Sequence, residues 1–300
     1  MTRLKKIKAN WELYLLIAPV VAYFIIFHYW PIYGVQIAFK DFSATKGIAG
    51  SPWVEFKHFT RFFESIFFDR VIRNTIGISL YSLAVTFPLP IILALMMNEV
   101  KNKLFKKAVQ NISYAPYFIS QVVLVGIVIL FLSPEAGVIN RVIEFFGGEA
   151  KLFMADTAWF KSIFVFSGLW QGLGWGTVIY MAVLAGVDPH LIEASIVDGA
   201  NKWQRIRHIS IPTLIPTAIV LLILAAGNVM NVGFEKVFLL QNPQNLDSSD
   251  VIATYIYRTG LLNSQYSFAA AIGLFNSVIN CTILVVVNAV ARRYSSNSLW

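Results

Sequence analysis

Long apolar runs alternate with short polar segments along almost the whole chain. Runs of roughly 20 residues, the length at which a helix crosses the hydrocarbon core of a bilayer, occupy 13–30, 75–97, 112–133, 162–187, 212–234 and 268–290. None of these runs contains Asp, Glu, Lys or Arg, and His28 lies near the end of the first run. Because a charged side chain inside a bilayer is costly, this pattern predicts membrane spans. We therefore expect an all-α integral membrane protein with six transmembrane helices.

The composition agrees with a membrane protein. The chain is 57% hydrophobic and 13% charged, whereas a soluble domain carries about 25% charged residues. Its single cysteine, Cys281, lies in the sixth run, so we expect a small apolar core residue and no disulfide framework or Cys-based metal site. The four His are scattered without metal-ligand spacing. We expect no metal and no cofactor on this chain.

The distribution of Lys and Arg predicts the orientation, because cytoplasmic loops carry an excess of these residues. With the N-terminus inside, the inner segments hold 13 of the 24 cations and five of the 16 acids, and the outer segments balance at 11 each. Large aromatic residues fill 23–31, where a signal peptide needs small residues, so the first run reads as an uncleaved anchor. We expect a multi-pass protein of the cell membrane with both termini cytoplasmic. The net charge of +8 then follows from topology, and no nucleic-acid partner is needed.

The most polar stretch between two spans is 188–211. Asp188 can cap the free amides of a helix, and Pro189 fits its first position. That helix can run to Asp198, where Gly199 permits the left-handed turn that ends it. We therefore expect a short helix followed by a sharp turn.

A second, basic helix is expected over 202–208. Ile211-Pro212 should end it and open the fifth span, because a proline inside a helix removes a hydrogen bond. The segment 188–211 thus forms a helix–turn–helix elbow at the membrane surface. An ordinary polar loop remains the alternative from the residues alone.

A longer pattern in the elbow resembles the EAA loop of ABC importer permeases. That loop reads Glu-Ala-Ala, three residues, Gly, nine residues, Ile-x-Leu-Pro, and here Ser195 replaces the third Ala and Ile211 the Leu. The resemblance implies a type I ABC importer permease fold in which the elbow is a cytoplasmic coupling helix seated on an ATPase. It assigns ATPase coupling to Glu193, Ala194, Ser195, Asp198, Gly199, Ile209 and Pro212.

Other stretches resemble the maltose-type sugar permeases, in particular their polysaccharide and oligosaccharide branch. These stretches are YWPIYGVQIAFKDF, GNVMNVGFEKVFLLQNP, DVIATYIYRTGL and QYSFAAAIGLFNSVIN. The resemblance implies an N-terminal anchor helix and outer amphipathic segment over 1–74 and a permease core over 75–300. It also implies a second homologous permease, two cytoplasmic ATPase subunits that hold ATP and Mg, an extracytoplasmic sugar-binding protein and an oligosaccharide substrate, in a setting of membrane lipid.

Spans four to six also carry residues suited to a sugar path. Sugars are bound by aromatic faces and amide groups, and an amide inside a span must face protein or a water-filled cavity. Asn228 and Asn231 are three residues apart and should share a helix face. The candidates are Trp170, Gln171, Trp175, Asn228, Asn231 and Asn276. Helix packing, with small residues at Gly168, Gly172 and Gly176, explains the same region equally well.

The energy source must lie outside the chain, because the sequence has no Walker A motif. We therefore expect the membrane subunit of an ATP-driven oligosaccharide importer, with no catalysis on this chain. A secondary transporter or channel would need a charged residue or a discontinuous helix at mid-span. A membrane enzyme would need clustered acid–base or metal ligands, and the outer carboxylates Glu135, Glu144 and Asp156 form no motif.

Overall fold

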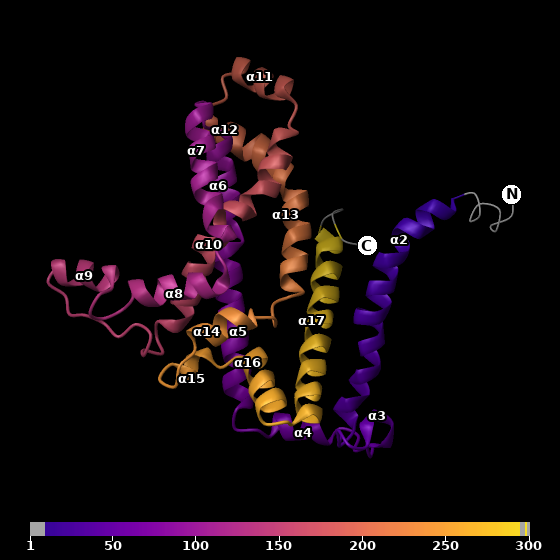
Figure 1. Cartoon of the computed structure of the whole chain (residues 1–300). Helices are drawn as coiled ribbons and strands as arrows, with labels where there is room; N and C mark the ends of the chain where they lie inside the picture. The colour runs from indigo at the N-terminus through magenta and orange to yellow at the C-terminus, as the bar shows by residue number, and fades with distance from the viewer. Residues whose placement is uncertain (1–9, 295–297, 299–300) are drawn as a thin grey trace. The chain divides into compact units, whose positions relative to one another are not determined.

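The computed structural model describes residues 10–294 and residue 298, which are organised as helices and turns (Figure 1). Within this described part, the only extended pairing is an isolated antiparallel bridge between Lys40 and Trp53. The α-helices are α2 (Trp11–Phe24), α3 (Gly47–Gly50), α4 (Lys57–Phe63), α5 (Phe68–Thr86), α6 (Pro88–Asn98), α7 (Lys103–Tyr114), α8 (Gln121–Phe131), α9 (Val138–Phe145), α10 (Phe160–Ala185), α11 (Pro189–Val197), α12 (Lys202–Arg205), α13 (Ile211–Ala226), α14 (Phe234–Leu240), α15 (Leu246–Ser249), α16 (Ile252–Ile256) and α17 (Tyr266–Tyr294). The π or 3-10 segments are η1 (Ile25–Tyr29), η2 (Trp30–Phe39), η3 (Ala115–Phe118), η4 (Ile206–Ser210) and η5 (Tyr257–Leu262).

The chain divides into two compact units, which are described separately. Unit 1 comprises 1–65 and 256–275, and unit 2 comprises 66–255 and 276–300. In unit 1, Phe62 of α4 is buried and its ring contacts Phe268 and Phe275 of α17. The predicted boundary at residue 74 separates the N-terminal segment from the permease core, whereas the two units are defined by their internal contacts. That boundary stays a prediction.

Unit 2 is built around α10, which packs against α5, α6, α7 and α13. One buried cluster includes Ile78, Phe160 and Val237, and a second includes Tyr180 and Leu214. These clusters bury one side of the apolar helices and leave the other side exposed, as expected for helices that face lipid or further subunits.

The membrane-spanning pattern is confirmed as all-helical, with six spans if each bent pair counts as one. Within the described residues, four helices are long and apolar enough to cross a bilayer: Trp11–Phe39, Phe68–Asn98, Lys202–Ala226 and Tyr266–Arg293. The other two are Lys103–Phe118 with Gln121–Phe131, bent by 102°, and Phe160–Ala185 with Pro189–Val197, bent by 74°. The cations Arg3, Lys5, Lys6 and Lys8 of the orientation argument lie outside the described residues.

The third span is discontinuous, which corrects the expected continuous helix over 112–133. Pro116 has no amide hydrogen and cannot continue the helical ladder, and Ser120 caps a new helix by accepting from the amide of Val123. Gln171 of α10 donates to the carbonyl of Ile119 at 2.8 Å. Non-helical backbone at membrane depth must be satisfied by protein, and here a single buried glutamine does so.

The fifth span also differs from expectation, because its helix ends at Ala226 rather than at residue 234. Asn228 and Asn231 therefore lie on a turn, not on one helix face, with the amide of Asn231 donating to the carbonyl of Asn228 at 2.9 Å. Two asparagines of α17 hold this turn: Asn276 donates to the side-chain oxygen of Asn231 at 2.9 Å, and Asn280 accepts from the amide of Met230 at 3.0 Å.

Cys281 is exposed rather than part of a core. Only 17% of an apolar 18-residue stretch of α17 is buried within this chain. Position 281 therefore belongs to the wide exposed surface of α17. Apolar composition alone does not distinguish this exposed surface from the packed side of the helix.

Candidate coupling elbow and transport cavity

The first helix of the elbow, α11, begins and ends as expected from its sequence. Asp188 caps it by accepting from the amide of His190 at 2.9 Å, and Pro189 takes the first position. At the other end Gly199 has φ +80°, and the amide of Ala200 donates to the carbonyl of Ser195 at 2.9 Å. This pairing is a Schellman turn, in which glycine avoids the clash that a Cβ meets at positive φ.

The second helix of the elbow does not stop at Ile211-Pro212, which corrects that expectation. The helix from Lys202 runs through η4 into α13 and ends at Ala226. Pro212 is accommodated because η4 is a wider π turn, in which the usual i to i−4 bond is already displaced. The helix that begins at Lys202 starts with a capping box. The side chain of Asn201 accepts from the backbone amide of Gln204 at 2.9 Å, and the side chain of Gln204 accepts from the backbone amide of Asn201 at 2.8 Å.

A partly buried ion pair ties the elbow to the end of α6. Arg205 lies 3.5 Å from the carboxylate of Glu99 and also donates to the carbonyl of Ala200 at 2.9 Å. Both charged side chains are about four-fifths covered, at 17% and 22% exposure. Sequence reasoning missed this pair, because 106 residues separate its partners.

Apolar side chains are exposed on the elbow, where polar ones would be expected beside water. Leu191, Ile196, Val197 and Trp203 are all exposed, Val197 at 86%. Glu193, Ala194 and Gly199 of the predicted coupling set are exposed beside them, and Ser195 is half-buried. Exposed apolar groups rimmed by polar residues mark interaction surfaces. We call Leu191, Ile196, Val197 and Trp203 the apolar elbow patch.

Two adjoining cavities in unit 2, of about 530 and 220 Å³, share Ser82, Thr86, Phe164 and Gly233. We call them together the polar cavity. The larger is also lined by Gln121, Gln171, Glu235 and Lys236, and the smaller by Asn228 and Asn231. These side chains come from α5, α8, α10, α14 and the turn after α13, so only the tertiary structure brings them together.

The structure brings three of the predicted path residues, Gln171, Asn228 and Asn231, to the polar cavity. Their amides serve the backbone or one another: Gln171 donates to Ile119, Asn228 donates to the carbonyl of Leu224 at 3.0 Å, and Asn231 accepts from Asn276. Most of the side-chain amides that the sequence suggested for sugar binding are thus hydrogen-bonded to the protein itself, next to the helix breaks.

Neither predicted tryptophan lines the polar cavity. Trp175 stacks on Tyr117 with ring centroids 4.6 Å apart. Trp170 lines a separate apolar cavity of about 650 Å³ together with Phe131 and Trp159. The expected glycine stripe is also not one packing face. Gly176 approaches Pro90 of α6 and Gly168 approaches the side chain of Lys236 of α14, whereas a Cβ at Gly172 would meet no atom within 4 Å.

Lys236 of α14 is a buried charged residue of the polar cavity that sequence reasoning missed. It is 7% exposed, and its ammonium donates to the carbonyl of Phe164 at 2.7 Å and lies 4.6 Å from that residue's ring centroid. Burial lowers the pKa of Lys236 to about 8. The only sequence signal was its place directly after the fifth apolar run.

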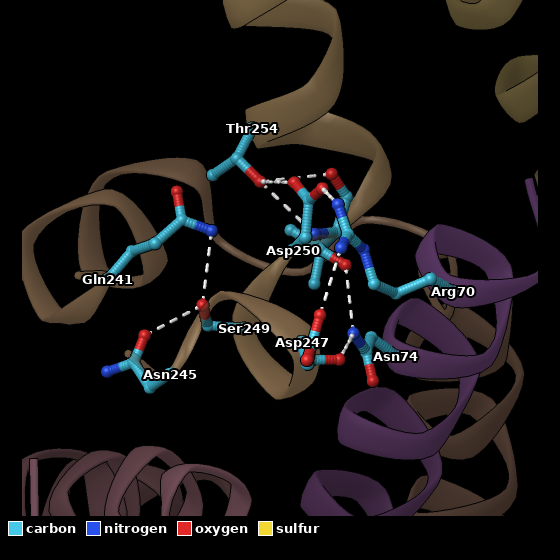
Figure 2. Close-up of polar contacts among 9 residues, drawn as sticks. Arg70, Asn74, Gln241, Asn245, Asp247, Ser249, Asp250 and Thr254 are labelled. Carbon is cyan, nitrogen blue, oxygen red and sulfur yellow. Dashed lines mark hydrogen bonds and ion pairs between the residues drawn. The ribbon is translucent and has the colours of Figure 1, made fainter. Parts of the chain in front are cut away.

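A second polar cluster, around Arg70 of α5, holds the segment between α14 and α16 in place (Figure 2). Arg70 donates to Asp247 at 3.0 Å and to the fully buried Asp250 at 2.9 Å. Asn74 of the same helix donates to the backbone carbonyls of both residues. Thr254 adds a hydrogen bond to Asp250 at 3.3 Å. We call this group the Arg70 clamp.

Comparison with known proteins agrees with a helical membrane permease carrying an EAA elbow. The chain belongs to the family described as binding-protein-dependent transport system inner membrane component, whose model matches residues 86–296. The matched segment includes α11 and all of the polar cavity's lining except Ile78, Ser79, Ser82 and Leu83 of α5.

Curated relatives and solved structures agree with this membership. The chain is 40% identical to Protein LplB of Bacillus subtilis strain 168 over 98% of this chain and 92% of the relative. It is 38% identical to the polygalacturonan/rhamnogalacturonan transport system permease protein YteP of the same organism, over 96% and 90%. A crystal structure of a bacterial alginate ABC transporter in complex with an alginate pentasaccharide-bound periplasmic protein contains a chain that is 40% identical, with TM-score 0.91 and coverage of 98% and 99%.

These findings confirm the predicted sugar-permease family and the type I ABC importer permease fold. The chain is a membrane-embedded transport subunit rather than an enzyme. No group of three or more potential metal ligands occurs within the described part of the chain. The helix break at Ile119, which could have favoured an ion-coupled transporter, here belongs to an ABC permease and is satisfied by an uncharged glutamine.

Proposed function

We propose that this chain forms half of the membrane channel of an ATP-driven importer for oligosaccharides or polysaccharide fragments. Its partners are a second homologous permease, two cytoplasmic ATPase subunits that bind ATP and Mg, and an extracytoplasmic binding protein that delivers the sugar. The relatives named for polygalacturonan/rhamnogalacturonan transport and for alginate support this class of cargo. Both termini and the elbow are cytoplasmic in this proposal, as the Lys and Arg excess indicates.

The observation that carries the coupling role is the apolar elbow patch beside the EAA residues. A docked ATPase buries these apolar groups, so that movement of the ATPase pair on ATP binding pulls the elbow with it. The Arg205–Glu99 pair and the continuous helix from Lys202 to Ala226 then pass this displacement to α6 and α13. Sugar enters the polar cavity from the outer side, and ATP hydrolysis restores the inward-facing state.

Ala194→Arg tests this assignment, because Ala194 is exposed on α11 and a long charged side chain prevents close docking. We expect normal membrane abundance, weaker co-purification of the ATPase and loss of sugar-stimulated ATP hydrolysis and uptake in vesicles. Ala150→Arg is the matched control, since Ala150 is also exposed but lies outside the elbow.

Full uptake and normal ATPase binding in Ala194→Arg would remove the coupling role from α11. Equal losses in Ala194→Arg and Ala150→Arg would instead indicate a general defect in folding or assembly. A panel of saccharides that leaves ATP hydrolysis by the wild-type complex unstimulated, with the binding protein present, would refute the importer assignment as a whole.

A further inference from the structure

The ammonium of Lys236 is held in the polar cavity without a carboxylate beside it. Lys236 takes part in none of the ion pairs that the described residues form. Its neighbour Glu235 also lines the cavity but is exposed, and it too is absent from those pairs. The charge is therefore compensated only by the carbonyl and the ring of Phe164.

This arrangement leaves binding capacity on the ammonium. A lysine has three N–H donors, and one is used for the carbonyl of Phe164. Gly168 brings α10 so close that a Cβ at this position would lie 2.9 Å from the lysine nitrogen. The ammonium is therefore positioned by a backbone carbonyl on one side and by a bare stretch of helix on the other.

A buried charge is destabilising unless a partner neutralises it. The hydroxyls of Ser82 and Thr86 line the same cavity and suit the hydroxyl groups of a sugar. An ammonium next to hydroxyl groups matches a saccharide that carries carboxylates.

We propose that the polar cavity selects anionic saccharides and that Lys236 binds a uronate carboxylate of the cargo during passage. This inference rests on the proposed import function and narrows its substrate class. The cargo's carboxylate provides the missing counter-charge, so that a uronate sugar is favoured in the cavity over its neutral analogue. Lys236 thereby acts as a specificity-determining residue on the transport path.

The test compares free-acid and methyl-esterified forms of the same sugars. The complete complex, with its permease partner, ATPases and binding protein, is reconstituted in vesicles and supplied with trigalacturonate, trimannuronate and their methyl esters. We expect the wild type to import at least one acid with a kcat/KM roughly ten- to hundredfold above that of its ester, as a charge-assisted contact implies. Lys236→Met should bring this ratio close to one, and Lys236→Arg should keep most of it.

Two controls separate selectivity from structure. Lys151→Met removes a lysine that is exposed and does not line the polar cavity, and it should leave the ratio unchanged. Gly168→Ala keeps the charge but displaces the ammonium, and it should lower the ratio. Because acid and ester are compared within each variant, a general loss of activity affects both and cancels.

The outcomes distinguish this inference from the import function itself. An unchanged acid-to-ester ratio in Lys236→Met, or equal import of acid and ester by the wild type, would overturn the anion site. Import of neutral maltotriose or arabinotriose but of no uronate would do the same while leaving the importer assignment intact. If none of these sugars stimulates ATP hydrolysis or enters the vesicles, the proposed function fails first.

Discussion

The Arg70 clamp predicts a large loss of stability when its arginine is removed. Arg70→Met keeps most of the length of the side chain but removes the guanidinium that lies 2.9 Å from the fully buried carboxylate of Asp250. The hydrogen bonds that Asn74 makes to the carbonyls of Asp247 and Asp250 remain and hold the segment near α5. The carboxylate therefore cannot easily turn outward to water.

The expected magnitude follows from burial. Removing one partner of a buried ion pair costs about 3–5 kcal/mol, chiefly because the other charge stays desolvated. An exposed pair contributes about 1 kcal/mol or less. Lys57 and Asp41 supply the matched control, since they form an ion pair at 2.6 Å with side chains 59% and 40% exposed.

The assay is denaturant unfolding in detergent, combined with hydrogen exchange over 241–254. We expect Arg70→Met to lose about 3–5 kcal/mol and Lys57→Met about 1 kcal/mol or less. Arg70→Met combined with Asp250→Asn should recover part of the loss, because a neutral amide then replaces the buried carboxylate that faced Arg70. If Arg70→Met and Lys57→Met were equally mild, or the double variant were worse than the sum of its parts, the buried-charge argument would be refuted.

Three further predictions concern the elbow, the orientation and the cavity. Gly199→Val should weaken coupling, because valine is strained at the φ of +80° found at this position. Gly199→Asn should largely preserve coupling, because asparagine tolerates this backbone region and no atom lies close to an added Cβ. ATP hydrolysis coupled to uptake measures the difference. In a Cys281→Ser background, single cysteines in 188–211 should react with an impermeant reagent only in inside-out vesicles and those in 31–74 only in intact cells; the opposite pattern would reverse the orientation. Burial lowers the pKa of Lys236 to about 8 in the folded chain. Between about pH 8 and the ordinary lysine range, the unfolded chain therefore binds more protons than the folded one. The free energy of unfolding should rise with pH over this window in the wild type but not in Lys236→Met. Changing Glu235, the other charged residue of the cavity, to Gln leaves Lys236 in place, so this variant should keep the rise that Lys236→Met loses. Thermal unfolding across pH 7–10 checks both variants.

Local signals predicted the parts of the elbow that depend on neighbours in sequence. Asp188, Pro189 and Gly199 each act within a few residues of their own position, as a cap, a first helical residue and a left-handed turn. The capping box at Asn201 and Gln204 is of the same kind and could have been recognised from its spacing. The EAA pattern then indicated the family, which the comparisons confirm.

The sequence by itself determined the all-helical membrane class, the number of apolar runs and the presence of the elbow, because hydrophobic length and capping are local properties. Only the tertiary structure decided where the helices break and what the polar residues near the breaks do. Pro116 marks a break, but the glutamine that satisfies it comes from α10, and the asparagines that hold the turn after α13 come from α17. Lys236 looked like a loop charge for the same reason. Its burial depends on the packing of α14 against α10, which no neighbour in sequence can reveal.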